Sequence, residues 1–378
     1  MRSLPAALLA ALATLCLAAA PAGAASDAAG ADRQLDRALH QLVAAEGGPP
    51  GAIAVVQRGS ARRVHAAGVA DLGNRAPLRA GKRMRIASVS KAFSGATALS
   101  LVAQGVLRLD DTIAELLPEL PAAWHRVTLG QALHHTSGLP DFSQSEAFAV
   151  AAETSSAFPP PPRALLSYVA DQPLRFTPDT AYEYSNSDNV VVALMVQAAT
   201  GTPYVRALRK KVTGPLGLGA TRMANGILLP DPFLHGYSPT ATGGTEDVSQ
   251  IVAFGGWAWA SGGILSTPGN LNRFVRGYVG RRIFGAGLQR RQFDWVPGAS
   301  EPPGPGANSA GLAVFRYRTR CGTVYGHTGS ILGYTQLIAA SRDGRRSLAF
   351  SITTQAPKKL VPRLRRAQTA AVCAALAG

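Results

Sequence analysis

A serine and a lysine separated by two residues form the first group that could carry chemistry. Ser88 and Lys91 stand at the start of an apolar helical pattern, and residues three apart share a helix face, so the amine is expected beside the hydroxyl. A serine hydroxyl is a weak nucleophile without a base, and free N–H groups at a helix N-terminus favour the oxyanion that follows attack. The pair predicts covalent catalysis at Ser88, although so short a pattern also arises by chance.

A tyrosine and an asparagine before a second helical pattern form another group. Tyr184 and Asn186 precede the pattern that begins near residue 187. A phenol whose pKa is lowered by a nearby ammonium can act as a general base, and an asparagine amide can hydrogen-bond both Lys91 and a substrate amide. The alternative is a tyrosine at the edge of the core followed by an ordinary helix cap.

The third group is His327-Thr328-Gly329, at the end of a predicted strand. Glycine lets a ligand approach the backbone closely, and a threonine hydroxyl can hold a carboxylate. Taken alone, this group indicates little.

Together and in this order, the three groups resemble the conserved boxes of the serine β-lactamase and penicillin-binding family. The Y-x-N and H-T-G forms are similar to the class C-like branch, and most of all to secreted D-alanyl-D-alanine carboxypeptidases. Similar text surrounds them in residues 135–140, 214–218, 261–263 and 325–327. The resemblance runs from about residue 51 to residue 373.

The resemblance implies a role for each matching residue of the first two boxes. Ser88 would be the acylated nucleophile and Lys91 its proton partner. Tyr184 would be the general base of acylation and then the general acid toward the leaving amine. Asn186 would orient the substrate amide.

The third box and its surroundings would complete the substrate site. His327 and Thr328 would face the carboxylate of a C-terminal D-alanine or of a β-lactam, beside Gly329. The backbone N–H groups of Ser88 and Ser330 would form the oxyanion hole. Trp257 would line the pocket, or else be a buried core aromatic.

The function implied is a serine D-alanyl-D-alanine carboxypeptidase that acts on peptidoglycan stem peptides through an acyl-enzyme and is acylated by β-lactams. It needs no cofactor and no metal; the adjacent His134 and His135 suit a structural turn better than a zinc pair. A class C-like β-lactamase, an esterase or a D-amino-acid amidase on the same scaffold remain alternatives, because a fold does not fix the substrate. Less favoured are a non-catalytic binder of wall fragments or penicillin, which should have lost a box, and a cationic wall-adhesion protein, which leaves the boxes unexplained.

The elements that must position these residues predict an α+β fold. Strand patterns over 51–57, 63–70, 312–318, 323–327, 335–341 and 347–353 flank a mostly helical middle. Helical patterns cover 32–45, 88–105 and 360–376, with shorter ones between 112 and 279. We expect one antiparallel sheet built from both termini, with a helical lobe inserted into it. The single catalytic domain would span 25–378, with a sheet lobe of about 32–85 and 310–378 and a helical lobe of about 86–309.

The first 24 residues read as a cleavable secretory signal, with Arg2 before an apolar run and small residues at its end. An uncleaved membrane anchor is the alternative; no other stretch is long and apolar enough to insert stably in a membrane. Export exposes Cys321 and Cys373 to oxidising conditions, which favours a disulfide over two unrelated core cysteines.

The chain is strongly basic, with a formal net charge of +16. Outside a cell, such a charge would concentrate the protein near anionic wall polymers or phospholipid. Nucleic acid is not expected as a partner, because the basic clusters are short and are not interleaved with aromatic residues. The sequence therefore predicts a secreted, extracytoplasmic monomer that binds stem peptides or β-lactams, with association with the cell wall as a further expectation from its charge.

Overall fold

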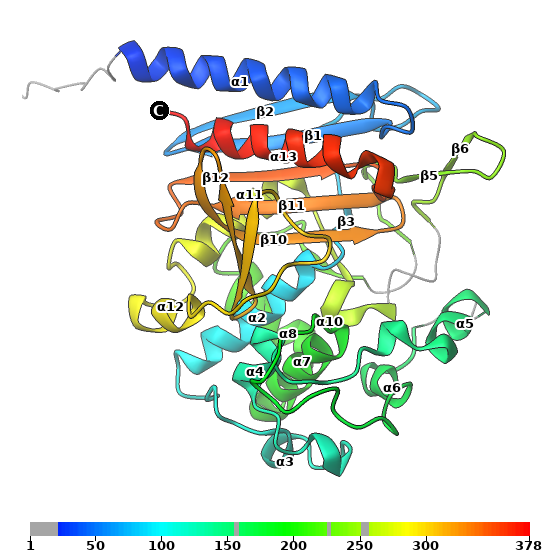
Figure 1. Cartoon of the computed structure of the whole chain (residues 1–378), viewed down its shortest axis with the longest axis vertical. Helices are drawn as coiled ribbons and strands as arrows, with labels where there is room; N and C mark the ends of the chain where they lie inside the picture. The colour runs from blue at the N-terminus through cyan, green and yellow to red at the C-terminus, as the bar shows by residue number, and fades with distance from the viewer. Residues whose placement is uncertain (1–21, 155–158, 225–227, 251–256) are drawn as a thin grey trace, which may run out of the picture.

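The fold is organised around a seven-stranded antiparallel sheet with the strand order β2-β1-β12-β11-β10-β9-β8 (Figure 1). The computed structural model describes residues 22–154, 159–224, 228–250 and 257–378. The strands are β1 (Gly51–Arg58), β2 (Ala61–Gly68), β8 (Ala307–Gly311), β9 (Val314–Thr319), β10 (Gly322–Ile331), β11 (Tyr334–Ala340) and β12 (Arg346–Ile352). Since β1 pairs with β12, the predicted sheet built from both ends of the chain is confirmed.

Helices cover both faces of this sheet. Alternate residues of a strand point to opposite faces, and in β1 Ile53 joins one core cluster while Ala52 and Ala54 join the other. The second cluster lies under α1 (Ala22–Val43) and α13 (Val361–Leu376), which run side by side in Figure 1. The first cluster lies under α11 (Pro268–Val279) and α2 (Val89–Val102).

The placement of α11 corrects one detail of the sequence prediction. Its residues were assigned to the helical lobe, yet α11 packs against β1, β11 and β12. The reason is that it presents buried apolar residues, Leu271, Phe274, Val275 and Tyr278 among them, at helical spacing to the sheet. The position of α11 in the sequence, within a run of helices, does not reveal that it packs on the sheet.

The other helices lie beyond β10 (Figure 1). They are α3 (Ile113–Leu116), α4 (Leu129–His134), α5 (Glu146–Thr154), α6 (Pro162–Ser167), α7 (Asn186–Thr200), α8 (Tyr204–Leu208), α10 (Trp259–Gly262) and α12 (Ala286–Gln292). Among them, α3, α4, α6, α8 and α10 pack against α7. Thr112 and Thr128 each form a capping box with the residue three positions on, which fixes where α3 and α4 begin. The core of this region is α2, buried along most of its length.

Two small sheets were not predicted. One has the order β3-β7-β4 and the other pairs β5 with β6. Their strands are β3 (Met84–Arg85), β4 (Arg222–Met223), β5 (Tyr237–Pro239), β6 (Thr245–Asp247) and β7 (Ile264–Ser266). Runs of two or three residues carry no readable alternation, so only tertiary pairing defines them.

The N-terminal helix is longer than expected and is tied to the sheet by an ion pair. It begins at Ala22, whereas the sequence pattern began at residue 32. Arg58 on β1 donates to both carboxylate oxygens of Asp32, at 2.9 and 2.7 Å, and to the Ala374 carbonyl of α13 at 2.7 Å. Most of the predicted signal segment lies outside the described residues, so its cleavage stays a prediction. Among the helices that the structure describes, none has the length and apolar character needed to cross a membrane.

A disulfide closes the C-terminal part of the chain. Cys321, in the turn between β9 and β10, is joined to Cys373 on α13, with the two Cα atoms 5.2 Å apart and a sequence separation of 52. The bond thus fastens the C-terminal helix to the sheet near the strand that carries His327.

Replacing both Cys321 and Cys373 by serine should lower the free energy of unfolding by about 4 kcal/mol, the loop-closure entropy for a ring of this size. Denaturant unfolding monitored by circular dichroism measures it. The wild-type protein should lose the same amount on adding dithiothreitol, and the double variant should not respond. A wild-type protein indifferent to the reductant would show that the bond does not form.

Candidate active site

The amine of Lys91 is the centre of the candidate site. Its Nζ lies 3.1 Å from Ser88 Oγ, 2.6 Å from Asn186 Oδ1 and 2.9 Å from the Ser261 carbonyl oxygen. The side chain is completely buried. Three acceptors match the three donors of an ammonium, so the charged form is satisfied without water. The first two sequence boxes are therefore brought together, with Ser261 added to them.

Burial moves the amine toward neutrality at physiological pH. Loss of solvent lowers the pKa of Lys91 to about 7, although the negative charges of Asp141, Glu301 and Asp188 oppose the fall. At that pKa both forms are well populated near pH 7. A neutral amine 3.1 Å from Ser88 Oγ can accept the hydroxyl proton, which is what a serine nucleophile requires.

Ser88 lies at the N-terminus of helix α2. It is the N-cap residue of this helix and its side chain makes no capping hydrogen bond, so its oxygen is left for chemistry. Ala87 just before it has φ 50°, in the left-handed region that non-glycine residues rarely adopt. A Cβ atom added to Gly329 would lie 2.6 Å from the Ile86 carbonyl oxygen and 3.1 Å from the Ser88 nitrogen. Glycine at 329 is what allows β10 to approach the nucleophile this closely.

Tyr184 stands next to this pair in the protonated state. Lys91 Nζ lies 5.0 Å from the centre of its ring, and its buried hydroxyl has no hydrogen-bond partner of good geometry in the described chain. Burial raises the pKa of Tyr184 well above its usual value, and the nearby Ser88 hydroxyl only partly opposes this. The expected lowering of this pKa by the ammonium is therefore wrong for the unliganded site: desolvation outweighs the ammonium, which is itself buried and partly neutral.

Asn186 orients the lysine but does not offer a free amide donor. Its Oδ1 accepts from Lys91, while its Nδ2 donates to Asp141 Oδ2 at 3.0 Å and to Ser143 Oγ at 2.8 Å. These partners fix which end of the amide faces the amine. Binding a substrate amide through Nδ2 would require one of the two bonds to break.

His327 and Thr328 do not face the substrate as expected. Both side chains are fully buried, and neither lines the cavity at Ser88. Thr328 Oγ1 donates to the Pro302 carbonyl oxygen at 2.6 Å, and His327 Nδ1 is 2.6 Å from the Thr328 carbonyl oxygen. Burial, with a smaller effect of Lys91, lowers the pKa of His327 to about 3 even though this bond opposes the fall, so the imidazole is neutral. Neighbouring residues explain the difference from the expectation. The Thr328 hydroxyl is hydrogen-bonded to the loop that contains Pro302, and aromatic side chains pack around the histidine.

A cavity of about 250 Å³ opens beside the nucleophile. The predicted residues Ser88, Asn186, Trp257 and Ser330 line it, and Trp257 also packs edge-on against Phe148 with ring centres 5.8 Å apart. The remaining lining residues are Ala87, Phe142, Ser143, Phe148, Ala258, Ser261, Gly262 and Ile331. The wall is thus apolar and aromatic, with polar groups gathered around the nucleophile.

The sequence analysis did not predict several residues that lie at or near this cavity. Asp141, Phe142, Ser143 and Phe148 follow the 135–140 segment directly, and no spacing rule links them to Ser88. They reach the site because Ser187 Oγ accepts from the Phe142 amide at 3.0 Å, which holds this segment against the start of α7.

A buried histidine and a buried aspartate lie next to Tyr184 and Asn186. His135 Nδ1 lies 2.7 Å from Asp188 Oδ2, and Ser137 Oγ donates to the other oxygen of Asp188 at 2.5 Å. Burial lowers the pKa of His135 to about 3 and raises that of Asp188. The His135 ring lies 4.5 Å from the Tyr184 ring, centre to centre. The segment is therefore a structural turn, as the sequence indicated, and it packs against Tyr184.

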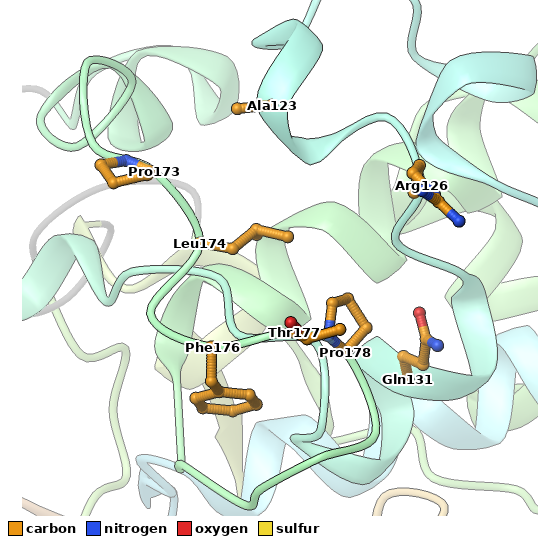
Figure 2. A pocket seen from close by; sticks show the side chains of 8 residues that line it. All are labelled: Ala123, Arg126, Gln131, Pro173, Leu174, Phe176, Thr177 and Pro178. Carbon is orange, nitrogen blue, oxygen red and sulfur yellow. The ribbon is translucent and has the colours of Figure 1, made fainter.

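A larger cavity, of about 640 Å³, lies away from this chemistry. Figure 2 shows its lining, which comes from the loop that carries Phe176 and from the Arg126 and Gln131 segments. Arg126 is its only ionisable side chain, and no nucleophile stands beside a base there. In the described part of the chain there is also no cluster of three or more side chains suited to a metal ion.

The chain is similar in sequence to several bacterial hydrolases. It is 28% identical to a D-aminopeptidase of Cereibacter sphaeroides over 60% of this chain and 42% of that protein. It is 26% identical to the D-alanyl-D-alanine-carboxypeptidase/endopeptidase AmpH of Escherichia coli, over 82% of this chain and 80% of that protein. The chain spans only about two fifths of the length of the D-aminopeptidase and of some other curated relatives.

Solved structures agree on the fold. A D-stereospecific amidohydrolase from a Streptomyces species superposes with a TM-score of 0.74 at 26% identity, covering 87% of this chain and 97% of that one. A family model described as Beta-lactamase matches residues 35–372. With this match over most of its length, and with Lys91 and Tyr184 beside Ser88, the chain belongs to the β-lactamase family of serine hydrolases.

Proposed function

We propose that this chain is a serine amidohydrolase that cleaves the amide bond following a D-amino-acid residue, through an acyl-enzyme on Ser88. The observation that carries the proposal is the buried Lys91 amine 3.1 Å from Ser88 Oγ at the edge of an apolar cavity. The D configuration is supported by similarity to a D-stereospecific amidohydrolase and to AmpH. The proposal includes export through the N-terminal signal and action as a monomer.

The reaction follows from the protonation states. Neutral Lys91 takes the proton of Ser88 as Oγ attacks the carbonyl carbon, and the oxyanion forms toward the backbone N–H groups of Ser88 and Ser330. The protonated phenol of Tyr184 gives its proton to the leaving amine as the C–N bond breaks. The Lys91 ammonium then returns a proton to the tyrosinate, which leaves the amine neutral for the next step. Water attacks the acyl-enzyme with the amine again as base, which releases the acid and restores Ser88.

The charges around the site favour an uncharged leaving group. A carboxylate needs a cation or free donors, but His327 is neutral and the Thr328 hydroxyl is already bonded to Pro302. Asp141 and Glu301 add negative charge that Lys91 senses. An amide or a neutral amine thus leaves with less electrostatic opposition than a D-alanine carboxylate would.

A D-alanyl-D-alanine carboxypeptidase, the activity that the sequence favoured, is the second candidate. Its support is the similarity to AmpH across four fifths of both chains and the intact H-T-G box on β10. The two candidates share the acyl-enzyme and differ in what leaves, so one matched pair of substrates separates them.

Replacing Ser88 by alanine should abolish covalent labelling by a fluorescent penicillin and all amide hydrolysis, because Ser88 supplies the hydroxyl that is hydrogen-bonded to the Lys91 amine. Gel fluorescence and product release measure both. Ser100→Ala, on the same helix but away from the amine, is the matched control and should keep both. Labelling that persists without Ser88 would remove it as the nucleophile.

The pH profile should report the titration of Lys91. Because the neutral amine is the base, kcat/KM should rise with pH to a plateau, with a midpoint near 7. Glu301→Gln removes a negative charge that favours the ammonium, so the midpoint should move to lower pH; Glu119→Gln, which Lys91 does not sense, should leave it in place. A profile without this limb, or one that Glu301→Gln does not move, would count against Lys91 as the base.

Two peptides that differ only in one carboxylate test the leaving group. Diacetyl-Lys-D-Ala-D-alaninamide should be cleaved with a kcat/KM equal to or above that of diacetyl-Lys-D-Ala-D-Ala, because no cation awaits the carboxylate. The L-Ala-L-alaninamide peptide is the stereochemical control and should not react. A preference of about tenfold or more for the free acid would establish the carboxypeptidase instead, while Ser88 labelling would keep the shared acyl-enzyme.

A further inference from the structure

A basic groove runs between the two helices that cover the outer face of the sheet. Two hollows, of about 560 and 380 Å³, lie along α1 and α13 and share Ala38, Gln41 and Arg366 in their linings, so they form one continuous groove. Figure 1 shows the two helices side by side across this face. We call this feature the α1–α13 groove.

The α1–α13 groove is lined by cations, and only Arg363 among them acts on a carboxylate of the described chain, Glu46, which lies outside the lining. Its ionisable side chains are five arginines, Arg37, Arg320, Arg363, Arg365 and Arg366, and no aspartate or glutamate lines it. All five are exposed, and within the described residues none of their guanidinium groups has an ion pair or a hydrogen bond. Gln34, Gln41 and Thr369 add neutral hydrogen-bonding groups to the same lining. Like charges held this close favour a bound anion.

The shape and chemistry of the groove select the kind of anion. Arginine presents a planar fork of donors that matches phosphate oxygens, and no lysine lines the groove. An elongated hollow between helices suits a flexible chain better than the flat surface of a bilayer. No aromatic side chain lines it either, so nucleic-acid bases would find nothing to stack on.

We propose that the α1–α13 groove is a binding site for a linear polymer of phosphate groups, separate from the catalytic cavity. Ser88 belongs to the α2 side of the sheet and the groove to the other side, so a bound polymer leaves the nucleophile open. Such a site would hold the hydrolase on an anionic matrix while it acts on another ligand. This proposal does not depend on which amide the enzyme cleaves.

The test compares two variants of equal net charge. The groove variant carries Arg37→Gln, Arg363→Gln and Arg366→Gln; the control carries Arg206→Gln, Arg209→Gln and Arg290→Gln, exposed residues that also lack partners in the described chain and lie on α8, on the segment after it and on α12. Binding of linear inorganic polyphosphate is measured by fluorescence anisotropy at several salt concentrations. The groove variant should lose at least about tenfold in affinity at physiological salt, and its salt slope should fall by about 2, while the control keeps nearly wild-type binding.

Other outcomes would overturn the proposal. Equal losses in both variants would show that only net charge matters. A groove variant that loses binding to phosphatidylglycerol vesicles but not to polyphosphate would make this a membrane-facing surface, and tighter binding of single-stranded DNA than of polyphosphate would make it a nucleic-acid site. Circular dichroism and penicillin labelling at Ser88 should be unchanged in both variants, which keeps a loss of binding distinct from misfolding.

Discussion

The amine of Lys91 is removed from water, and the elements around it are arranged to make that burial tolerable. Its hydrogen-bond partners come from the N-cap of α2, from the first residue of α7 and from a carbonyl of α10. The drop in its pKa from 10.5 to about 7 corresponds to about 5 kcal/mol of lost preference for the charged form. A displacement of any of these elements would leave a buried amine unpaired, so the same contacts that hold the site also fix how the helices meet.

The sheet supplies the rigid side of this arrangement. Pairing of β1 with β12 brings the two ends of the chain together, and the helices that carry Lys91 and Asn186 are inserted between them in sequence. β10 then passes close to the start of α2, at a distance that only a glycine at 329 permits. The nucleophile is thus positioned by a strand from one end of the chain and a helix from the other.

Local patterns in the sequence revealed the main strands, α2 and the residues Ser88, Lys91, Tyr184 and Asn186, because these depend on periodicity and on short spacings. The features that these patterns could not reveal depend on tertiary contacts. The side of the sheet taken by α11, the aromatic wall from Phe142 and Phe148, and the burial of His327 are all set by segments distant in sequence. The pKa values also depend on tertiary contacts. The sequence suggested that an ammonium activates the Tyr184 phenol, but burial dominates and keeps it protonated.

The neutral histidine of the third box has a consequence for the base itself. Burial is the main cause of the low pKa of His327, and the Lys91 charge adds a smaller effect in the same direction, so the two groups interact across the site. A permanent cation at position 327 would repel the Lys91 ammonium and lower the pKa of Lys91 further, whereas a neutral imidazole leaves the negative charges near Lys91, of Asp141, Glu301 and Asp188, to oppose desolvation. In the proposed mechanism, a neutral histidine at this position adds no repulsion that would lower the pKa of Lys91 below about 7, and it offers no positive charge to a substrate carboxylate. If the proposed mechanism holds, the residue at position 327 therefore affects both the base and the preferred leaving group.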